Sequence, residues 1–326
     1  MRAHVVLIRA PGEPEVLELH ERELGAPAPG EALVRQTCAG VNYIDIQHRS
    51  GRYPQPAYPA GVGVEAAGVV EAIGAGVTEV VPGDRVAYVT IPPGAYASAR
   101  LISAERLVPV PAAIDDVTAG ANLLRGFTAQ YLVKSTYAVK AGDVVLLHAA
   151  AGGVGVILGQ WARHLGATVI GTVGSDAKVE IARRNGCEHV IVYTREDFAK
   201  RVRELTDGVG AHVVYDGVGA TTFEGSLASL RPRGTLCTYG TPSGPIPPFD
   251  VFQLNRLGSL YLTSPSNFTY TRDRGEMLER ARDFFDAIAR GIIRIETPHR
   301  YPLAEAARAH ADLQARRTAG GVALLG

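Results

Sequence analysis

The chain has 326 residues, enough for two domains of ordinary size, and its 33 Lys and Arg residues balance 33 Asp and Glu residues. This zero net charge argues against a nucleic-acid or membrane-surface partner. No apolar run approaches the roughly 18–20 residues of a membrane span, and the first apolar run, His4–Ile8, is too short for a signal-peptide core. Three scattered cysteines suit a reducing cytoplasm and give neither a disulfide framework nor a zinc site. We therefore expect a cytoplasmic protein.

The first 124 residues have the sequence pattern of a β-rich, barrel-like domain. Short strand-like runs alternate with turns rich in proline and glycine, such as 26–30 and 91–94. The expected strands are His4–Ile8, Glu31–Thr37, Gly68–Ile73 and Arg85–Val89. A helix over Val117–Val133 is expected to lead into the next domain.

The region that follows opens with a strand, a glycine turn and a helix. Four apolar residues, Val144–Leu147, read as a buried strand, and a turn with Gly152, Gly153 and Gly155 comes next. Apolar residues then recur at helical spacing as far as Gly166, which suits the end of a helix. Such a turn presents helix N–H groups to a pyrophosphate, and glycine is required because a Cβ would hold the phosphates away. The motif departs from G-x-G-x-x-G, so a ligand-free strand-to-helix turn is the alternative reading.

Strands and helices then alternate at regular spacing, which predicts a doubly wound parallel sheet of the Rossmann type. The expected strands are Ala167–Val173, His189–Tyr193, Val213–Asp216, Thr235–Tyr239 and Ser259–Thr263, and the expected helices are Lys178–Arg184, Phe198–Leu205, Phe223–Leu230 and Glu276–Arg290. A sixth strand completes such a sheet, so the chain beyond it should return to the first domain. We expect one domain over residues 1–124 plus 266–326 and an inserted nucleotide-binding domain over 125–265.

Several short motifs occur in order along the whole chain. They are Asn42–Asp45, Arg49–Pro54, Gly63–Gly68, Val81–Val86, His148–Gly155, Val214–Asp216 and Pro265–Ser266. Together they resemble the quinone oxidoreductase branch, with its ζ-crystallin-like members, of the medium-chain dehydrogenase/reductase superfamily. The resemblance implies a GroES-like catalytic domain around a Rossmann domain that binds NADPH.

The resemblance also bears on metal binding. Zinc-dependent members of the superfamily carry Cys at the position of Asn42 and His at the position of Val64, and neither side chain here supplies the thiolate or imidazole that zinc needs. We expect no metal. Without a Lewis acid, the acceptor must take hydride readily by itself, as quinones and α,β-unsaturated carbonyls do.

The end of the second nucleotide-domain strand decides which cofactor is expected. NAD enzymes place an acid there to hold the ribose 2′-OH, but residues 171–174 contain none. Ser175 and Lys178 start the next helix, where a hydroxyl, an ammonium and free N–H groups could hold a 2′-phosphate. The resemblance assigns the same role to Tyr193. We expect NADPH, with an exposed helix lysine as the alternative reading of Lys178.

The resemblance also places the reacting end. It implies catalytic roles for Asn42, Tyr53 and Thr128, of which Asn42 and Thr128 could bond the carboxamide or a substrate oxygen and Tyr53 could cover a flat acceptor. The expected cofactor contacts are Tyr43, Ile44, Asp45, Tyr131, Gly152, Gly153, Val154, Gly155, Gly174, Ser175, Lys178, Tyr193, Gly217, Tyr239, Gly240, Thr241, Ser264, Pro265, Ser266 and Arg316. Structural alternatives remain open: Asn42 could cap a helix starting near Tyr43, Asp45 could be a hydrogen-bond partner, and Tyr43 and Ile44 could be core.

Two positions depart from the family pattern, since Gln47 replaces Tyr and Ser264 replaces Arg. His48 could replace a lost proton donor, because histidine titrates near neutrality, although we expect its side chain at the solvent. The proton donor is therefore open.

The expected function is NADPH-dependent quinone reduction by direct hydride transfer. The alternatives are reduction of the C=C bond of enals or enones on the same fold and a non-catalytic, crystallin-like NADPH-binding protein. We expect a homodimer paired through Ser259–Thr263 at the sheet edge, with an edge shielded by its own chain as the alternative. The expected partner is a small-molecule quinone or enone, with no nucleic acid and no membrane.

Overall fold

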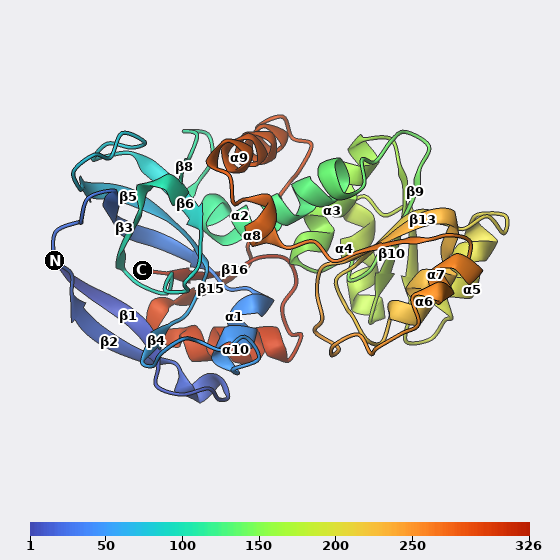
Figure 1. The fold of residues 1–326 in the computed structure, drawn as a ribbon, viewed down its shortest axis with the longest axis horizontal. Coiled ribbons are helices and arrows are strands. Elements are labelled where there is room, and N and C mark those ends of the chain that lie inside the picture. Colours follow the sequence, from blue (N-terminus) through green and yellow to red (C-terminus); the bar gives the residue numbers. More distant parts are fainter. The chain divides into compact units, whose positions relative to one another are not determined.

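The computed structural model describes residues 1–326, which separate into two compact units. The first unit comprises Met1–Leu124 and Ile295–Gly326, and the second comprises Arg125–Arg294. None of the helices is long and apolar enough to cross a membrane. Figure 1 shows the order of the elements along the chain.

The first unit is built from two antiparallel-rich sheets. Its strands are β1 (Arg2–Ile8), β2 (Glu18–Glu23), β3 (Glu31–Gly40), β4 (Ala60–Gly61), β5 (Glu65–Ile73), β6 (Arg85–Val89), β7 (Ala99–Ser103), β8 (Leu107–Pro109), β15 (His299–Pro302) and β16 (Val322–Leu325). The small sheet has the order β2-β1-β4, and the large one has the order β15-β16-β3-β5-β6-β8 with β7 also paired to β3. Helices α1 (Tyr43–Arg49) and α10 (Ala306–Gln314) pack together beside these sheets. The expectation of a β-rich, GroES-like part is confirmed.

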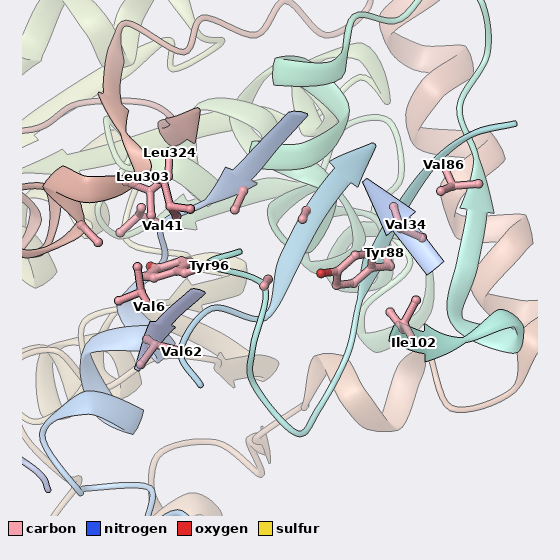
Figure 2. Close-up of a cluster of buried hydrophobic side chains, with 14 of the residues drawn as sticks. Val6, Val34, Val41, Val62, Val86, Tyr88, Tyr96, Ile102, Leu303 and Leu324 are labelled. Atoms are coloured by element: carbon pink, nitrogen blue, oxygen red, sulfur yellow. The ribbon is translucent and has the colours of Figure 1, made fainter. Parts of the chain in front are cut away.

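The core of this unit is aliphatic with two buried tyrosines. Figure 2 shows side chains from strands far apart in the sequence, such as Val34, Val86 and Leu324, gathered in one cluster. Tyr88 and Tyr96 are buried within the same cluster. Their hydroxyl groups need polar partners at this depth, and the partner of Tyr96 is part of the site described below.

The second unit is organised around a six-stranded parallel sheet. Its strands are β9 (Val144–Leu147), β10 (Thr168–Val173), β11 (His189–Val192), β12 (Ala211–Asp216), β13 (Leu230–Thr238) and β14 (Tyr261–Thr263). Their order, β11-β10-β9-β12-β13-β14, is the 3-2-1-4-5-6 order of the dinucleotide-binding fold. The predicted doubly wound sheet is confirmed. The order of the strands reverses between β9 and β12, so ligands of this fold bind at the carboxyl ends of those two strands.

Helices connect or follow the strands, and the expected ones begin close to their expected positions, whereas two short helices, Phe252–Arg256 and Asn267–Tyr270, are additional. These helices are α2 (Asp116–Tyr131), α3 (Gly153–His164), α4 (Val179–Arg184), α5 (Phe198–Leu205), α6 (Phe223–Ala228), α7 (Phe252–Arg256), α8 (Asn267–Tyr270) and α9 (Arg274–Ala289). A π-helical turn, Leu132–Thr136, follows α2, and a 3-10 turn, Asp176–Lys178, precedes α4. Within the unit, α3 packs beside α4 and α5 beside α6.

The second domain boundary differs from the expected one at 265/266. Helix α9 belongs to the second unit, which ends at Arg294. The reason is its buried face: Arg280 donates hydrogen bonds to the Tyr270 carbonyl and to Gln130, at 2.8 and 2.6 Å. The ring of Phe284 fills the space where Gly126 has no side chain. These contacts bind α9 to the start of the second unit, so the chain returns to the first unit only after residue 294.

Candidate functional site

The glycine turn joins β9 to α3, and Gly152 is the residue before the helix. Ala149 adopts a left-handed conformation with φ 53°. A Cβ on Gly155 would overlap the carbonyl oxygen of Ala149 and lie 2.8 Å from the Cα of Ala150. Glycine is therefore required here for the close approach of helix and strand, and the N–H groups of the first turn of this 12-residue helix form a cradle that suits a pyrophosphate.

An arginine that the sequence did not single out lies against this turn. A Cβ on Gly153 would be 2.5 Å from Nε of Arg125, so Gly153 leaves room for the guanidinium. Arg125 is 6% exposed. It comes from α2, 28 residues before the glycine, and no spacing rule links the two positions.

The expected 2′-phosphate residues come together at the ends of β10 and β11. The two strands are parallel, with Val173 opposite Val192, so Gly174 and Tyr193 follow at neighbouring positions. The Tyr193 hydroxyl is 3.0 Å from the place of a Cβ on Gly174. Ser175 is exposed and precedes the 3-10 turn that ends at Lys178. Lys178 thus lies before α4 and not inside a continuous helix.

A buried polar network joins the ends of β9 and β12 below the glycine turn. The Ser226 hydroxyl donates to Asp216 Oδ2 at 2.9 Å, so His148 Nε2–H donates to Ser226 Oγ at 3.0 Å. His148 Nδ1 then accepts from the Thr172 hydroxyl at 2.8 Å. Burial lowers the pKa of His148, against the opposing effect of Asp216. The imidazole is held neutral and structural.

Asp216 also shapes the turn that contains Gly217. Its Oδ1 accepts from the N–H groups of Val218 and Gly219, at 2.8 and 3.1 Å. A Cβ on Gly217 would lie 2.7 Å from the Tyr239 hydroxyl, so these two expected residues adjoin. Burial raises the pKa of Tyr239, which keeps it protonated.

Other expected residues of the second unit are close to these. A Cβ on Gly240 would lie 2.8 Å from the Gly217 carbonyl oxygen, and Thr241 begins a turn closed by the Gly244 N–H at 3.1 Å. Val154 lies in the first turn of α3, between Gly153 and Gly155.

Thr128 and Tyr131 are neighbours on α2 and are both nearly buried. The ring of Tyr131 stacks on Tyr270 with centroids 4.5 Å apart, and Asn267 donates to the Thr128 hydroxyl at 3.3 Å. Burial raises the pKa of Tyr131. Asn267 and Tyr270 were not expected from the sequence. They belong to α8, which follows the expected segment Ser264, Pro265 and Ser266, and Ser266 is the residue before this helix.

In the first unit, Asn42 precedes α1, as the structural reading of this residue foresaw. Its backbone N–H donates to Asp45 Oδ2 at 2.8 Å, and its side-chain Nδ2 donates to Glu65 Oε1 at 2.6 Å. The other oxygen of Glu65 accepts the Leu124 N–H at 2.7 Å. Asn42 is thus held from both sides by carboxylates. Tyr43 and Ile44 follow it and are half-buried.

Asp45 ends a second buried network. The Tyr96 hydroxyl donates to Asp45 Oδ2 at 3.0 Å and lies 2.9 Å from His310 Nε2. His310 Nδ1 is 3.3 Å from Arg49 Nη1, and because arginine only donates, Nδ1 accepts and Nε2 carries the proton. Burial and the Arg49 charge lower the pKa of His310 to about 3. A chain of hydrogen bonds with a fixed donor direction therefore runs from Arg49 through His310 and Tyr96 to Asp45.

The expected solvent position of His48 is wrong. His48 is 7% exposed, its Nδ1 has no hydrogen-bond partner, and burial lowers its pKa. Its ring lies 5.8 Å from that of Tyr53, centroid to centroid, and Tyr53 itself is 46% exposed. The neighbouring Gln47 is also buried. Arg316 is exposed beyond the end of α10, with φ 58°.

The residues present do not fit a zinc site. The Asn42 amide nitrogen donates to Glu65 and has no lone pair to give a metal. Val64 is an aliphatic side chain and is fully buried. The structure contains no group of three or more His, Cys, Asp or Glu side chains placed to hold a metal ion.

A parallel sheet of this order with a glycine turn between its first strand and helix, together with a GroES-like β unit, defines a medium-chain dehydrogenase/reductase. Family profiles agree: residues 28–143 match "Alcohol dehydrogenase GroES-like domain" and residues 153–283 match "Zinc-binding dehydrogenase". The chain belongs to the quinone oxidoreductase family of this superfamily.

Three similar proteins illustrate the family. A quinone oxidoreductase of Pseudomonas aeruginosa is 47% identical over 96% of this chain and 97% of its own length. The crystal structure of Escherichia coli quinone oxidoreductase complexed with NADPH is 42% identical, covers 99% of this chain and 100% of that one, and superposes with a TM-score of 0.97. A 2-haloacrylate reductase of Burkholderia sp. is 45% identical over 98% of both chains.

Proposed function

We propose that this chain is an NADPH-dependent oxidoreductase that reduces quinones. One observation supports the proposal. The glycine turn at Gly155 and the residues proposed to hold the 2′-phosphate, at the ends of β10 and β11, occur in this chain, which is similar along its full length to a quinone oxidoreductase complexed with NADPH. In this proposal, the first unit binds the acceptor and the second binds NADPH.

The second unit supplies the cofactor contacts. The N–H groups of the glycine turn hold the pyrophosphate, and Ser175, Lys178 and Tyr193 hold the 2′-phosphate. The end of the site that binds the nicotinamide is lined by Gly217, Tyr239, Gly240, Thr241, Thr128, Tyr131 and the segment 264–266. The bound cofactor supplies a hydride from nicotinamide C4.

Thr128 is proposed to orient the carboxamide. The Asn267 amide donates to the Thr128 hydroxyl at 3.3 Å, which fixes the position of this side chain. Its neighbour Tyr131, stacked on Tyr270 and kept protonated by burial, excludes water from the same place.

The first unit is proposed to position the acceptor. Asn42, fixed between Asp45 and Glu65, bonds a substrate or carboxamide oxygen, and the exposed Tyr53 covers a flat acceptor. Tyr43, Ile44, Asp45 and Arg316 complete the proposed contacts. Because burial favours the neutral form of His48, the proposal leaves proton delivery to water.

A panel of acceptors tests the proposal. NADPH oxidation is followed with 1,4-benzoquinone, 9,10-phenanthrenequinone, 2-alkenals and 2-chloroacrylate. Faster turnover of the quinones supports the proposal. Turnover confined to the C=C substrates favours the second candidate, a C=C reductase. The similarity to the Burkholderia protein named 2-haloacrylate reductase is the reason for including 2-chloroacrylate. Tight NADPH binding without turnover of any acceptor would indicate a non-catalytic, crystallin-like protein.

We also propose that two copies pair through β14. This strand is an edge of the sheet, and Tyr261 on it is 63% exposed. Exposed apolar side chains continue onto the neighbouring α7 segment, where Val251 and Phe252 are 63% and 71% exposed. An unprotected edge with apolar side chains favours strand pairing. Light scattering should give twice the 34.5 kDa chain mass. The variant Tyr261→Asp should give the monomer, and a monomeric wild type would refute the pairing.

The proposed location is the cytoplasm. All three cysteines are buried free thiols, none of them in a disulfide, which suits a reducing compartment.

A further inference from the structure

An ion pair joins the loops that follow β10 and β11. Arg195 Nη2 lies 2.6 Å from Asp176 Oδ1. Both side chains are exposed, Arg195 by 59% and Asp176 by 70%. The two residues are 19 positions apart in the chain.

The pair adjoins the residues proposed to hold the 2′-phosphate. Asp176 directly follows Ser175, and Arg195 comes two residues after Tyr193. The strand register fixes this arrangement, because Val173 and Val192 are partners in the parallel sheet. The Thr194 hydroxyl also donates to the Gly174 carbonyl at 3.4 Å, which ties the two loops together.

The two charges have opposite effects on a 2′-phosphate. The carboxylate of Asp176, in the 3-10 turn that follows β10, repels a 2′-phosphate through its charge. An arginine at the same place attracts the phosphate through paired N–H groups. An exposed ion pair is weak, so the guanidinium can exchange the Asp176 carboxylate for a doubly charged phosphate.

We propose that Arg195 is a specificity-determining residue for the 2′-phosphate of the cofactor. Without ligand it neutralises Asp176, and with ligand it contacts the phosphate directly. Asp176 is then the competitor that lowers the affinity of the site. This inference rests on the proposed function and adds a residue to its cofactor site.

The test compares two nucleotides that differ only in the 2′-phosphate. Calorimetry measures the binding of 2′,5′-ADP and 5′-AMP to the wild type and to the variants. Arg195→Ala should weaken 2′,5′-ADP by about tenfold, the loss of one charge-assisted contact, and should not weaken 5′-AMP. Asp176→Asn should bind 2′,5′-ADP more tightly. Arg201→Ala is the control, because Arg201 is also an exposed arginine, 45% exposed, that pairs with an acid, Glu204, at 2.8 Å; it should change neither affinity.

Other outcomes separate the inference from the proposed function. An unchanged 2′,5′-ADP affinity in Arg195→Ala, or equal weakening of both nucleotides, would overturn the role of Arg195 and leave the NADPH preference intact. Recovery of wild-type 2′,5′-ADP affinity in the double variant Arg195→Ala, Asp176→Asn would overturn the direct contact. A wild type that binds both nucleotides equally would overturn the inference and the proposed cofactor together.

Discussion

Replacing His310 should reduce the acid sensitivity of this protein. His310 is fully buried, and its pKa is about 3 against an ordinary value of 6.5. The folded state therefore excludes a proton that the unfolded chain binds below pH 6.5. The stability that depends on the neutral imidazole is complete above pH 6.5 and is lost as the pH falls toward 3.

The size of the effect follows from the two pKa values. Each pKa unit corresponds to about 1.4 kcal/mol, so the difference between the two pKa values amounts to about 5 kcal/mol over the whole range. Between pH 7 and pH 5 the loss is about 2 kcal/mol. Urea unfolding at pH 7, 6 and 5 measures the free energy of unfolding. Between pH 7 and pH 5, His310→Gln should lose about 2 kcal/mol less of this free energy than the wild type does.

Tyr96→Phe provides the control. It removes the hydroxyl that lies 2.9 Å from His310 Nε2 but keeps the buried imidazole. It should lower the free energy of unfolding at pH 7 by about 1 kcal/mol and retain the wild-type pH dependence. An equal pH slope in the wild type and His310→Gln would refute the reasoning.

Three further predictions concern the site and its supports. Gly155→Val should abolish NADPH binding, measured by fluorescence, while a folded circular dichroism spectrum is retained, because the new Cβ overlaps the Ala149 carbonyl; wild-type affinity would contradict the close packing of the turn. Glu65→Gln should lower stability by about 1–3 kcal/mol, since an amide cannot accept with both ends from Asn42 and Leu124; an unchanged melting temperature would count against this arrangement. The three cysteines, whose thiol pKa values burial raises to about 12, should react with a thiol reagent only after denaturation, and rapid reaction of the native protein would show that they are accessible.

The sheet of the second unit could be predicted because its central strands, β9, β10 and β12, are buried on both faces. Val144–Leu147 is a continuous apolar run, and the structure has the strand at those residues. In contrast, β2 reads Glu-Leu-His-Glu-Arg-Glu and has no apolar alternation. It forms because its backbone pairs with β1, from Arg2 opposite Glu23 to Leu7 opposite Glu18, and its side chains face solvent. No local pattern marks such a strand.

Some residues of the candidate site are likewise marked by the local sequence, whereas others are brought there only by tertiary contacts. The glycine turn and the candidate residues Ser175 and Lys178 could be proposed from the sequence because they follow strand ends, and the family resemblance added Tyr193. Arg125 and Arg195 could not, since tertiary packing and strand pairing bring them to the turn and to Asp176. His48 was misplaced because a short polar helix gives no sign of which face is covered, and the boundary at 265 was misplaced because α9 packs on α2 through Arg280 and Gln130.

The central claim is that this chain uses NADPH to reduce quinones, and one measurement addresses it directly. The rate of NADPH oxidation at a fixed concentration of 9,10-phenanthrenequinone is compared with the rate for NADH, each over a range of cofactor concentrations. We expect quinone-dependent turnover with a kcat/KM at least about tenfold higher for NADPH, a difference of about 1.4 kcal/mol in transition-state stabilisation. No quinone-dependent oxidation, or equal kcat/KM for the two cofactors, would contradict it.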